Sequence, residues 1–376
     1  MKKILILITK AEIGGAQMSV FNLSKKLKEK GYGITVGYGE GEFLKEKLDS
    51  EKIKNIRFKH LKRTFLPYKN IRFILEIREY IKKNNIDILH LNSSNTLFAA
   101  IAAKLIKNKP LVVFTYRGLS IIDENYTGSF ILKWIYWIFF KILLFFVDKQ
   151  VMVSKQNQIQ CQKIKLAKND ITIHNGLNPD LLNFLPKEQA LNYYEKKLGV
   201  KLQNKLIIGS IGRLAYQKNY EFLIKRIKEI KEKYPEIICI VAGEGPDRKK
   251  YEEEIKKNKL ENNFLLAGDI KEAFQYIKAF DIFVLPSRYE GLSITLIEAL
   301  FGAIPILATE VGGAKEQLEN AGLTYKLDNK EDFTNKMTKL IVDKDFRKKL
   351  SKKALNKSTF FTIEKTAQGY IKIFGN

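Results

Sequence analysis

One short stretch of the chain carries residues that could bind a diphosphate. Gly212 and Arg213 directly follow an apolar, strand-like run, and Lys218 comes shortly afterwards, just before a helical pattern begins. The end of a strand, a guanidinium and a lysine beside a helix N-terminus together suit phosphate oxygens. Arginine and lysine in loops are more often simply solvated, so this stretch alone does not define a phosphate site.

Two glutamates form a second candidate group. Glu290 lies in the loop sequence 286–293, and Glu298 lies in the helix expected to follow that loop. Glu290 is therefore expected in a turn, beside the unpaired backbone N–H groups at the start of the helix. In a sugar site a carboxylate can bind hydroxyl groups or stabilise an oxocarbenium-like centre, and N–H groups can bind phosphate oxygens. Each glutamate taken separately also suits a cap or a surface position.

Other motifs argue against cofactor and metal chemistry. The glycine clusters around Gly14 and Gly243 both lack the G-x-G-x-x-G spacing of a dinucleotide site, which argues against a nicotinamide dehydrogenase. The cysteines, Cys161 and Cys239, have neither the number of a disulfide framework nor the C-x-x-C spacing of a zinc site. Three scattered histidines add no metal cage, so no metal is expected.

The chain alternates apolar strand-like runs with helical patterns in two successive blocks. In the first block, strands are expected at 4–9, 34–37, 86–91, 111–115 and 150–153, with a helix at 16–30. In the second block, strands are expected at 206–212, 237–242, 264–267, 282–285 and 304–308, with helices at 220–233, 247–257, 271–279 and 293–301. This alternation predicts an α/β protein with two parallel, doubly wound sheets, joined through residues 175–204.

Four blocks taken together resemble one known family. They are GRLAYQK at 212–218, AGEGPDR at 242–248, PSRYEGLSITLIEAL at 286–300 and ATEVGGAKE at 308–316. These blocks are similar to motifs of the retaining glycosyltransferases of family 4. Glu290 and Glu298 match that family's E-x7-E motif, and Gly14-Gly15-Ala16 matches its N-terminal glycine turn.

The resemblance covers nearly the whole chain and implies the GT-B fold, in which two Rossmann-like, doubly wound domains face a deep cleft. It places an N-terminal acceptor-binding domain at 1–180 and a C-terminal nucleotide-sugar-binding domain at 205–355. A C-terminal helix within 356–376 could return to the N-terminal domain.

The resemblance also implies a role for each candidate residue. Arg213 and Lys218 would neutralise the leaving diphosphate in place of a metal ion, and Glu290 would contact the transferred sugar. Glu298 would hydrogen-bond the ribose. The other donor-binding positions would act mainly through their backbone near the phosphates or the sugar, and they are Gly15, Gly212, Gly291, Leu292 and Ser293.

One position departs from the family pattern. Many members have a histidine after the strand that here reads VVFTYRG, where this chain has Arg117. The histidine contact cannot be transferred, and Arg117 is assigned to the acceptor side as a residue that could bind phosphate on either substrate. In a front-face retaining mechanism the leaving phosphate can accept the acceptor's proton, so a side-chain base is not required.

Positive charge is concentrated in the N-terminal half. The whole chain has 66 Lys and Arg against 41 Asp and Glu, a formal charge of +25. Residues 52–83 are rich in Lys and Arg with interspersed aromatic residues, a composition that suits nucleic acid or an anionic membrane surface. A solvated, lysine-rich surface explains the same composition. No recognisable RNA- or DNA-binding module is present, so nucleic acid is not expected as a partner.

The segment 129–147, SFILKWIYWIFFKILLFFV, favours a membrane over nucleic acid. It contains both tryptophans, Trp134 and Trp137, and is interrupted only by Lys133 and Lys141. As a helix it would be about 28 Å long, close to the bilayer thickness, but two lysines in mid-segment are costly in hydrocarbon. The segment is therefore expected to be buried or to lie in the membrane interface, with a full span least favoured.

These observations predict a retaining, metal-independent hexosyltransferase that uses a nucleotide sugar, with UDP as the expected nucleotide, and a lipid-linked or other membrane-surface glycan acceptor. The start of the chain, MKKILILITKAEIGG, is interpreted as the first strand of a cytosolic protein rather than a signal peptide. The enzyme is thus expected in the cytoplasm, in peripheral contact with an anionic inner membrane face. The alternatives are a soluble GT-B enzyme acting on a free sugar or sugar phosphate and, more remotely, a basic nucleic-acid-binding protein.

Overall fold

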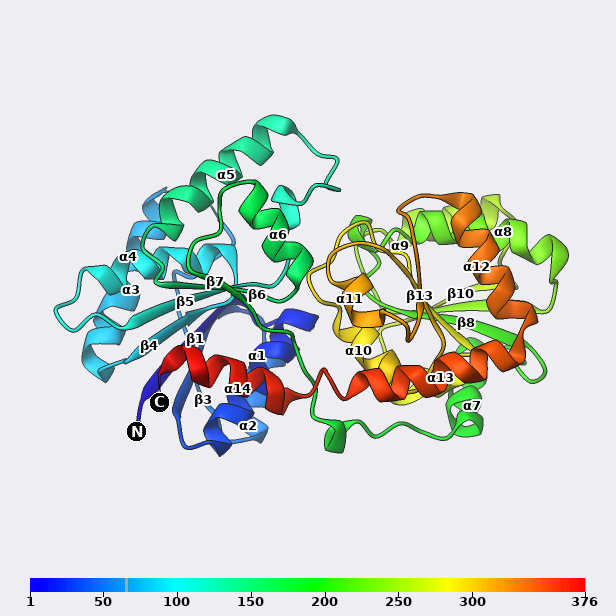
Figure 1. Cartoon of the computed structure of the whole chain (residues 1–376), viewed down its shortest axis with the longest axis horizontal. Helices are drawn as coiled ribbons and strands as arrows, with labels where there is room; N and C mark the ends of the chain where they lie inside the picture. The colour runs from blue at the N-terminus through cyan, green and yellow to red at the C-terminus, as the bar shows by residue number, and fades with distance from the viewer. Residues whose placement is uncertain (65–66, 376) are drawn as a thin grey trace. The chain divides into compact units, whose positions relative to one another are not determined.

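The computed structural model describes residues 1–64 and 67–375 (Figure 1). The chain divides into two compact units, which we call the N-terminal unit (Met1–Leu177 with Phe361–Asn376) and the C-terminal unit (Asn178–Phe360). Each unit is built on its own parallel sheet. The predicted fold class of two Rossmann-like α/β domains is confirmed.

The sheet of the N-terminal unit has the strand order β3-β2-β1-β4-β5-β6-β7. Its strands are β1 (Lys3–Lys10), β2 (Gly33–Glu40), β3 (Lys54–Arg57), β4 (Ile88–Leu91), β5 (Leu111–Tyr116), β6 (Lys149–Met152) and β7 (Asp170–Thr172). In β1, Ile4 and Ile6 pack into one core while Leu5 and Leu7 pack into another, and all four are fully buried. Burial on both faces explains why this strand is a continuous apolar run.

Helices cover both faces of this sheet (Figure 1). The core that contains Ile4 is covered by α1 (Gly15–Glu29), α2 (Phe43–Ser50) and α14 (Ile363–Phe374). The other core is covered by α3 (Pro67–Asn84), α4 (Phe98–Lys104), α5 (Phe130–Leu144) and α6 (Lys155–Lys163), with 3-10 turns η1 (Ser94–Leu97) and η2 (Ser120–Ile122) between them.

The last helix, α14, belongs to the N-terminal unit. The Ile363 N–H donates to the Leu177 carbonyl at 2.8 Å, and Lys26 and Lys30 on α1 and just after it pair with Glu364 at 2.8 Å each. The buried Tyr370 hydroxyl lies 2.9 Å from that of Thr115 on β5. These contacts join the end of the chain to the first sheet.

The sheet of the C-terminal unit has the strand order β10-β9-β8-β11-β12-β13. Its strands are β8 (Leu206–Ile211), β9 (Ile237–Ala242), β10 (Phe264–Gly268), β11 (Ile282–Leu285), β12 (Ile306–Thr309) and β13 (Leu323–Tyr325). Its helices are α7 (Lys187–Leu198), α8 (Tyr220–Lys233), α9 (Arg248–Lys257), α10 (Ile294–Phe301), α11 (Ala314–Leu318), α12 (Lys330–Val342) and α13 (Lys344–Ser358), with 3-10 turns η3 (Pro179–Leu181), η4 (Tyr216–Lys218) and η5 (Ala273–Ala279). The strand order reverses at β8 and β11, and ligands bind beside the carboxyl ends of strands at such a point.

Two local predictions were wrong. Residues 175–204 were interpreted as a connection, but α7 is an integral part of the C-terminal unit, because its Ala190 and Tyr194 are fully buried. Tyr193 on the same helix stacks on Tyr276 of η5 at 3.8 Å between ring centres. The helix expected at 271–279 is the 3-10 turn η5, which follows Glu272 in the left-handed conformation (φ 53°).

Candidate functional site

Two loops of the C-terminal unit bring most of the predicted donor residues together. One loop begins at Gly212 after β8 and leads into η4, which ends at Lys218. The other leaves β11 and carries Glu290 to the start of α10. Because β8 and β11 are parallel neighbours, both loops emerge at the same edge of the sheet.

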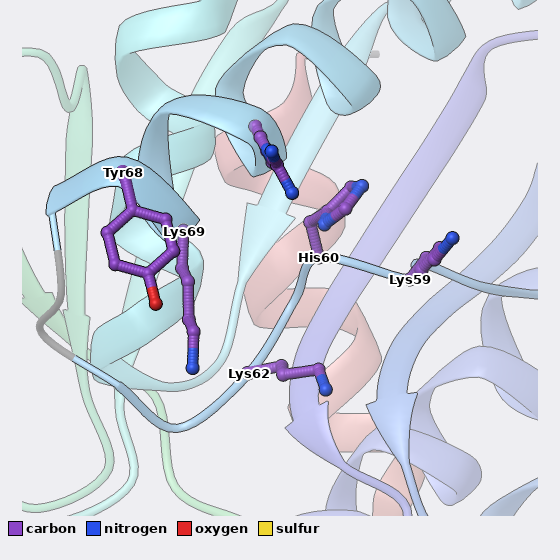
Figure 2. A pocket seen from close by; sticks show the side chains of 6 residues that line it. Lys59, His60, Lys62, Tyr68 and Lys69 are labelled. Atoms are coloured by element: carbon purple, nitrogen blue, oxygen red, sulfur yellow. The ribbon is translucent and has the colours of Figure 1, made fainter.

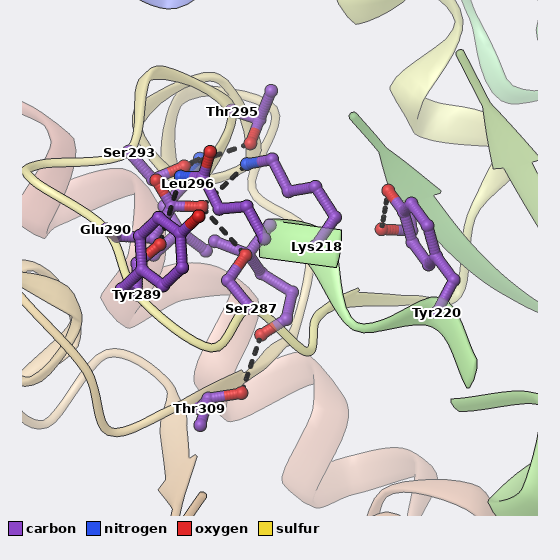
Figure 3. A network of polar contacts seen from close by, with 12 residues as sticks. Lys218, Tyr220, Ser287, Tyr289, Glu290, Ser293, Thr295, Leu296 and Thr309 are labelled. Atoms are coloured by element: carbon purple, nitrogen blue, oxygen red, sulfur yellow. Dashed lines mark hydrogen bonds and ion pairs between the residues drawn. The ribbon is translucent and has the colours of Figure 1, made fainter. Parts of the chain in front are cut away.

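Lys218 and Glu290 form a close, largely buried ion pair (Figure 3). The Lys218 ammonium lies 2.6 Å from Glu290 Oε1, and the side chains are only 15% and 10% exposed. The Ser287 hydroxyl donates to the same carboxylate oxygen at 2.7 Å. The pair therefore holds a cation and an anion in fixed positions, each with bonding capacity left for a ligand.

Further contacts of backbone and side chains hold the two loops together. Gln217 Nε2 donates to the Tyr289 carbonyl at 3.0 Å, and the Arg288 N–H donates to the Gln217 carbonyl at 2.8 Å. The Arg288 guanidinium lies over the Tyr216 ring, 4.3 Å from its centre. The relative positions of Lys218 and Glu290 thus do not depend on their own ion pair alone.

A glycine permits a further close approach beside Glu290. Gly312 has a φ of 51°, and a Cβ atom there would lie 2.2 Å from the Glu290 carbonyl oxygen. Only glycine fits that position without displacing the loop. The glycine of the 308–316 block therefore has a packing role next to the candidate site.

Arg213 stands apart from this pair. Its side chain is exposed, and it makes no ion pair with any residue in the described ranges. The structure therefore does not bring Arg213 into the contact of Lys218 and Glu290. It leaves the guanidinium at the end of β8, available for a ligand.

Ser293 has a different role from the predicted one. Its hydroxyl caps α10 by accepting from the Leu296 N–H at 3.4 Å. Its own N–H was expected to bind the donor, but it donates to Gln317 Oε1 at 3.1 Å, and Gln317 Nε2 donates back to the Ser293 carbonyl at 2.8 Å. That N–H is therefore already satisfied, and Gly291 and Leu292 are left as the predicted backbone positions.

Glu298 lies in the middle of α10, the helix that follows the loop of Glu290. Burial of its carboxyl group raises the pKa of Glu298 to about 8. No residue in the described ranges pairs with this carboxyl group as a hydrogen-bond or ion-pair partner. Such a carboxyl group would be stabilised by a ligand that donates hydrogen bonds to it, as two ribose hydroxyl groups do.

In the N-terminal unit, Arg117 follows β5 and is held by two asparagines. Its Nε and Nη2 donate to Asn92 Oδ1 at 3.1 and 2.6 Å, and its Nη1 donates to Asn175 Oδ1 at 2.6 Å. Burial lowers the pKa of Arg117, and no carboxylate among the described residues pairs with it. A partly buried guanidinium held only by neutral acceptors can bind an anionic ligand group with its remaining N–H groups.

Gly15 is the first residue of α1, after the carboxyl end of β1. It therefore lies at the same edge of the N-terminal sheet as Arg117. Its contact with the donor phosphate remains a prediction.

Two family models match the chain, one on each half. Residues 13–181 match Glycosyltransferase Family 4, and residues 195–357 match Glycosyl transferases group 1. The chain is 31% identical over 310 residues to the uncharacterized glycosyltransferase MJ1059 of Methanocaldococcus jannaschii, an alignment that covers 78% of this chain and 71% of that protein. The chain belongs to glycosyltransferase family 4.

This family 4 glycosyltransferase is also similar to proteins with a stated activity or a bound ligand. It is 27% identical over 289 residues to the UDP-Gal:alpha-D-GlcNAc-diphosphoundecaprenol alpha-1,3-galactosyltransferase of Escherichia coli, covering 73% of this chain and 72% of that protein. Among solved structures it is similar to Anabaena HepE in complex with UDP and glucose, with a TM-score of 0.83 and 18% identity over 99% of each chain. The likeness at this identity shows the GT-B fold.

Helix α5 of the glycosyltransferase is apolar on two faces. Phe140, Leu143 and Leu144 are buried in the core. Phe130 and Trp134 are 80% and 57% exposed, and further exposed apolar residues on the helix and directly after it are Ile131, Leu132, Ile135, Ile142 and Phe145. The prediction of burial therefore holds for one face of the segment 129–147, while the membrane-interface alternative remains a prediction for the exposed face.

Trp137 belongs to the packed part of α5, because its Nε1 donates to the Ile164 carbonyl at 2.8 Å. None of the helices in the described part of the chain has the length and apolar content that crossing a membrane requires.

The supporting residues Asn92, Asn175, Ser287 and Gln317 were missed by the sequence analysis. Asn92 and Ser287 follow the ends of β4 and β11, and polar residues at such positions were a usable signal. Gln317 lies on α11, and no spacing rule connects it to Ser293. In the described part of the chain, no three His, Cys, Asp or Glu side chains are grouped so that they could hold a metal ion.

Proposed function

We propose that this glycosyltransferase transfers a hexose from a UDP sugar to a lipid-linked or other membrane-surface glycan acceptor, with retention of anomeric configuration and without a metal ion. The observation that carries the proposal is the pair of Lys218 and Glu290, 2.6 Å apart at the ends of β8 and β11. It supplies a cation for a diphosphate and a carboxylate for a sugar at one place.

The proposed reaction needs only the two substrates and the residues named above. The bond between the anomeric carbon and the diphosphate oxygen breaks, and the acceptor hydroxyl forms the new bond on the same face of the sugar. Its proton passes to the leaving phosphate oxygen. Arg213 and Lys218 stabilise the negative charge that develops on the diphosphate, while Glu290 holds the sugar and Glu298 accepts from the ribose hydroxyl groups.

Two observations support the choice of substrates. The E. coli relative is a galactosyltransferase that takes UDP-Gal, and HepE binds UDP in its crystal structure, which supports a UDP sugar as donor. The E. coli relative acts on a diphosphoundecaprenol-linked sugar, which supports a lipid-linked acceptor. Arg117 suits an anionic acceptor group, and a sugar phosphate would satisfy it equally well, so a soluble enzyme acting on a sugar phosphate is the second candidate.

The proposed function predicts selective binding of uridine nucleotides. In thermal unfolding measurements with matched panels of UDP, GDP and ADP sugars, only the UDP sugars should raise the melting temperature strongly, because ligands that bind only the native state stabilise it. The proton coupling at the anomeric position of the product should show the configuration of the donor. Stabilisation by GDP or ADP sugars instead would refute the nucleotide assignment, and an inverted product would refute retention.

We also place the enzyme at the cytoplasmic face of an anionic membrane, in contact through α5. Phe130, Trp134 and Ile142 lie on one side of the helix and are 80%, 57% and 58% exposed. A helix that exposes large apolar and aromatic side chains on a strongly basic protein fits the boundary between headgroups and acyl chains. The occupant proposed for this face is therefore the bilayer itself.

Replacing Phe130, Trp134 and Ile142 together with serine should weaken the binding of the protein to anionic vesicles by about tenfold or more, because the apolar side chains that would be buried in the membrane are lost. Donor binding should not change, because all proposed donor residues except Gly15 lie in the C-terminal unit, and Gly15 is on α1 rather than α5. Co-sedimentation with vesicles and thermal shifts with UDP measure the two effects. A matched control replaces the exposed Val342, Leu355 and Phe360 of the C-terminal unit with serine. Equal loss in both variants, or no loss in the α5 variant, would contradict the membrane contact.

A further inference from the structure

A basic pocket that the proposed function does not use lies in the N-terminal unit, between the loop after β3 and the start of α3 (Figure 2). Its volume is about 220 Å³. Figure 2 shows Tyr68 and Lys69 extending from the first turn of α3, and His60 and Lys62 on the loop across from them. Among the residues that the structure describes, the lining of what we call the basic pocket is Lys59, His60, Lys62, Tyr68, Lys69 and Arg72.

The positive charge of the basic pocket is only partly compensated, since Glu76 and Glu40 are the carboxylates that contact its lining residues in the described ranges. Within the described ranges, Lys59, Lys69 and Arg72 form no ion pair. Lys62 is 3.7 Å from Glu40, and both side chains are about half exposed, so that contact is weak. Four cationic side chains around one cavity repel each other, and an anion bound among them would relieve that repulsion. Lysine, arginine and tyrosine are all donors that suit phosphate oxygens.

The loop that forms one wall is fixed without a ligand. The Glu76 carboxylate on α3 accepts from the Lys59 and His60 N–H groups at 2.9 and 3.1 Å. Phe58 and Leu61 on the same loop are 2% and 1% exposed and anchor it in the core. The basic pocket is therefore preorganised rather than a chance gathering of mobile lysines.

The size of the basic pocket limits its ligand. Sites for complete drug-sized molecules usually have volumes of about 300–1,000 Å³. At about 220 Å³ the basic pocket suits a phosphate or diphosphate group better than a whole nucleotide sugar. Apolar side chains beside it are also exposed, since Tyr68, Ile71 and Leu75 on α3 are 55%, 56% and 54% accessible. A phosphate site bordered by exposed apolar residues fits a lipid headgroup.

Two interactions link the loop after β3, which forms one wall of this pocket, to α5 and to the turn packed against it. The loop after β3 and the connection from β5 to α5 both leave the carboxyl edge of one parallel sheet. Arg63 on the loop is close enough to Tyr136 of α5 to influence its pKa, although burial, which raises that pKa, is the larger effect. The Thr64 carbonyl accepts from Asn95 Nδ2 of η1 at 2.8 Å, and η1 packs against α5.

We propose that the basic pocket binds the phosphate group of a membrane lipid, at the same bilayer surface that α5 contacts. This inference rests on the membrane contact proposed above. The phosphate could belong to an anionic phospholipid or to a polyprenyl phosphate of the acceptor type, and the chemistry of recognition is the same for both.

The test uses the full chain and a variant with reversed charge in the pocket, Lys69→Glu with Arg72→Glu. The matched control is Lys82→Glu with Lys83→Glu, two exposed lysines at the opposite end of α3, so that the change in net charge is identical. Co-sedimentation is measured with vesicles of phosphatidylcholine alone, with added phosphatidylglycerol, and with added polyprenyl phosphate at equal total charge. Inorganic pyrophosphate serves as the soluble competitor.

The pocket variant should bind the phosphate-bearing vesicles at least about tenfold more weakly than wild type, with the control within about twofold of wild type. Loss confined to polyprenyl phosphate identifies the acceptor's lipid, and loss with both lipids identifies a general lipid-phosphate site. Equal loss in pocket and control variants overturns the proposal, because net charge would then explain the binding. Vesicle binding of the pocket variant at the wild-type level overturns the lipid as the ligand. If polynucleotide binding, measured in parallel, is the only binding that the variant loses, the pocket binds nucleic acid instead.

Two further measurements keep the outcomes distinct. Thermal unfolding shows whether the pocket variant is folded, and Lys69→Gln with Arg72→Gln replaces it if it is not. Stabilisation by UDP depends on the C-terminal unit, so a wild type that does not respond to UDP sugars refutes the proposed function while its lipid binding still tests the basic pocket.

Discussion

Lys218→Ala is expected to slow glycosyl transfer by about 10²–10³-fold, which is the usual effect of removing one group that stabilises charge in a transition state. The ammonium of Lys218 is the cation nearest to Glu290, at 2.6 Å. Without it the leaving diphosphate loses a counter-charge and also meets a carboxylate that no lysine neutralises. Both effects raise the barrier, so kcat should fall more than KM rises.

The control for this variant is Lys225→Ala. Lys225 is an exposed lysine of the same unit that pairs with Glu221 at 2.9 Å, so the same chemical change is made away from the donor residues. Its activity should remain at the wild-type level. Addition of EDTA should leave wild-type activity unchanged, and activity that disappears with EDTA and returns with magnesium would show that Arg213 and Lys218 do not replace a metal.

The parts of the candidate donor site that lie close together along the chain could be predicted from local patterns. Gly212 and Lys218 flank one loop, and Glu290 and Glu298 flank the start of one helix. Strand ends and helix starts can be recognised from local apolar patterns, so these residues could be placed at one edge of a sheet before the structure was known. The structure adds the direct pairing of Lys218 with Glu290, two residues from different loops.

Interactions between distant segments could not be predicted in this way. The Ser293 N–H was expected to be free because helix starts leave N–H groups unpaired, but Gln317 satisfies it from another helix. Likewise the two asparagines that hold Arg117 come from the ends of different segments, Asn92 after β4 and Asn175 after β7. Which side chain fills such a position depends on tertiary packing, and a single sequence contains no periodic signal for it.

The sequence of the apolar segment around α5 also could not show which side chains are buried. Its composition predicted that it would be buried or interfacial but could not assign faces, because nearly every position is apolar. Phe140 packs in the core at 5% exposure, whereas Trp134 is 57% exposed. A helical pattern identifies a buried face only where polar residues mark the other one.

The two glutamates should respond differently to the same substitution. Glu290→Gln should lower kcat by about 10²-fold with the fold intact, because the amide oxygen still accepts from Ser287 but carries no charge toward the reacting sugar. Above about pH 8, where the Glu298 carboxyl group is ionised, Glu298→Gln should instead weaken donor binding by about tenfold, because a hydrogen bond to a charged group is lost. Steady-state kinetics and UDP titrations separate the two effects. Wild-type turnover in both variants would show that the E-x7-E assignment is wrong.

The pH dependence of Glu298 gives this assignment a second, independent test. Burial raises the pKa of Glu298 from 4.5 to about 8, so the native state retains a proton that the unfolded chain has lost between these pH values. This group's contribution to stability is therefore fully present below pH 4.5 and is lost as the pH rises to about 8. Relative to Glu298→Gln, the wild-type melting temperature should fall across that range.

Binding of the donor should change in the opposite direction. Ribose hydroxyl groups donate to the ionised carboxylate, so the affinity of wild type for UDP should increase as the pH approaches about 8 and then level off. Glu298→Gln serves as the reference, because the phosphates of UDP titrate equally with both proteins. If the two proteins show parallel pH profiles for binding while their melting temperatures still diverge, Glu298 is a buried acid without contact to the ribose. Divergence in both measurements is expected for a carboxylate that binds the nucleotide.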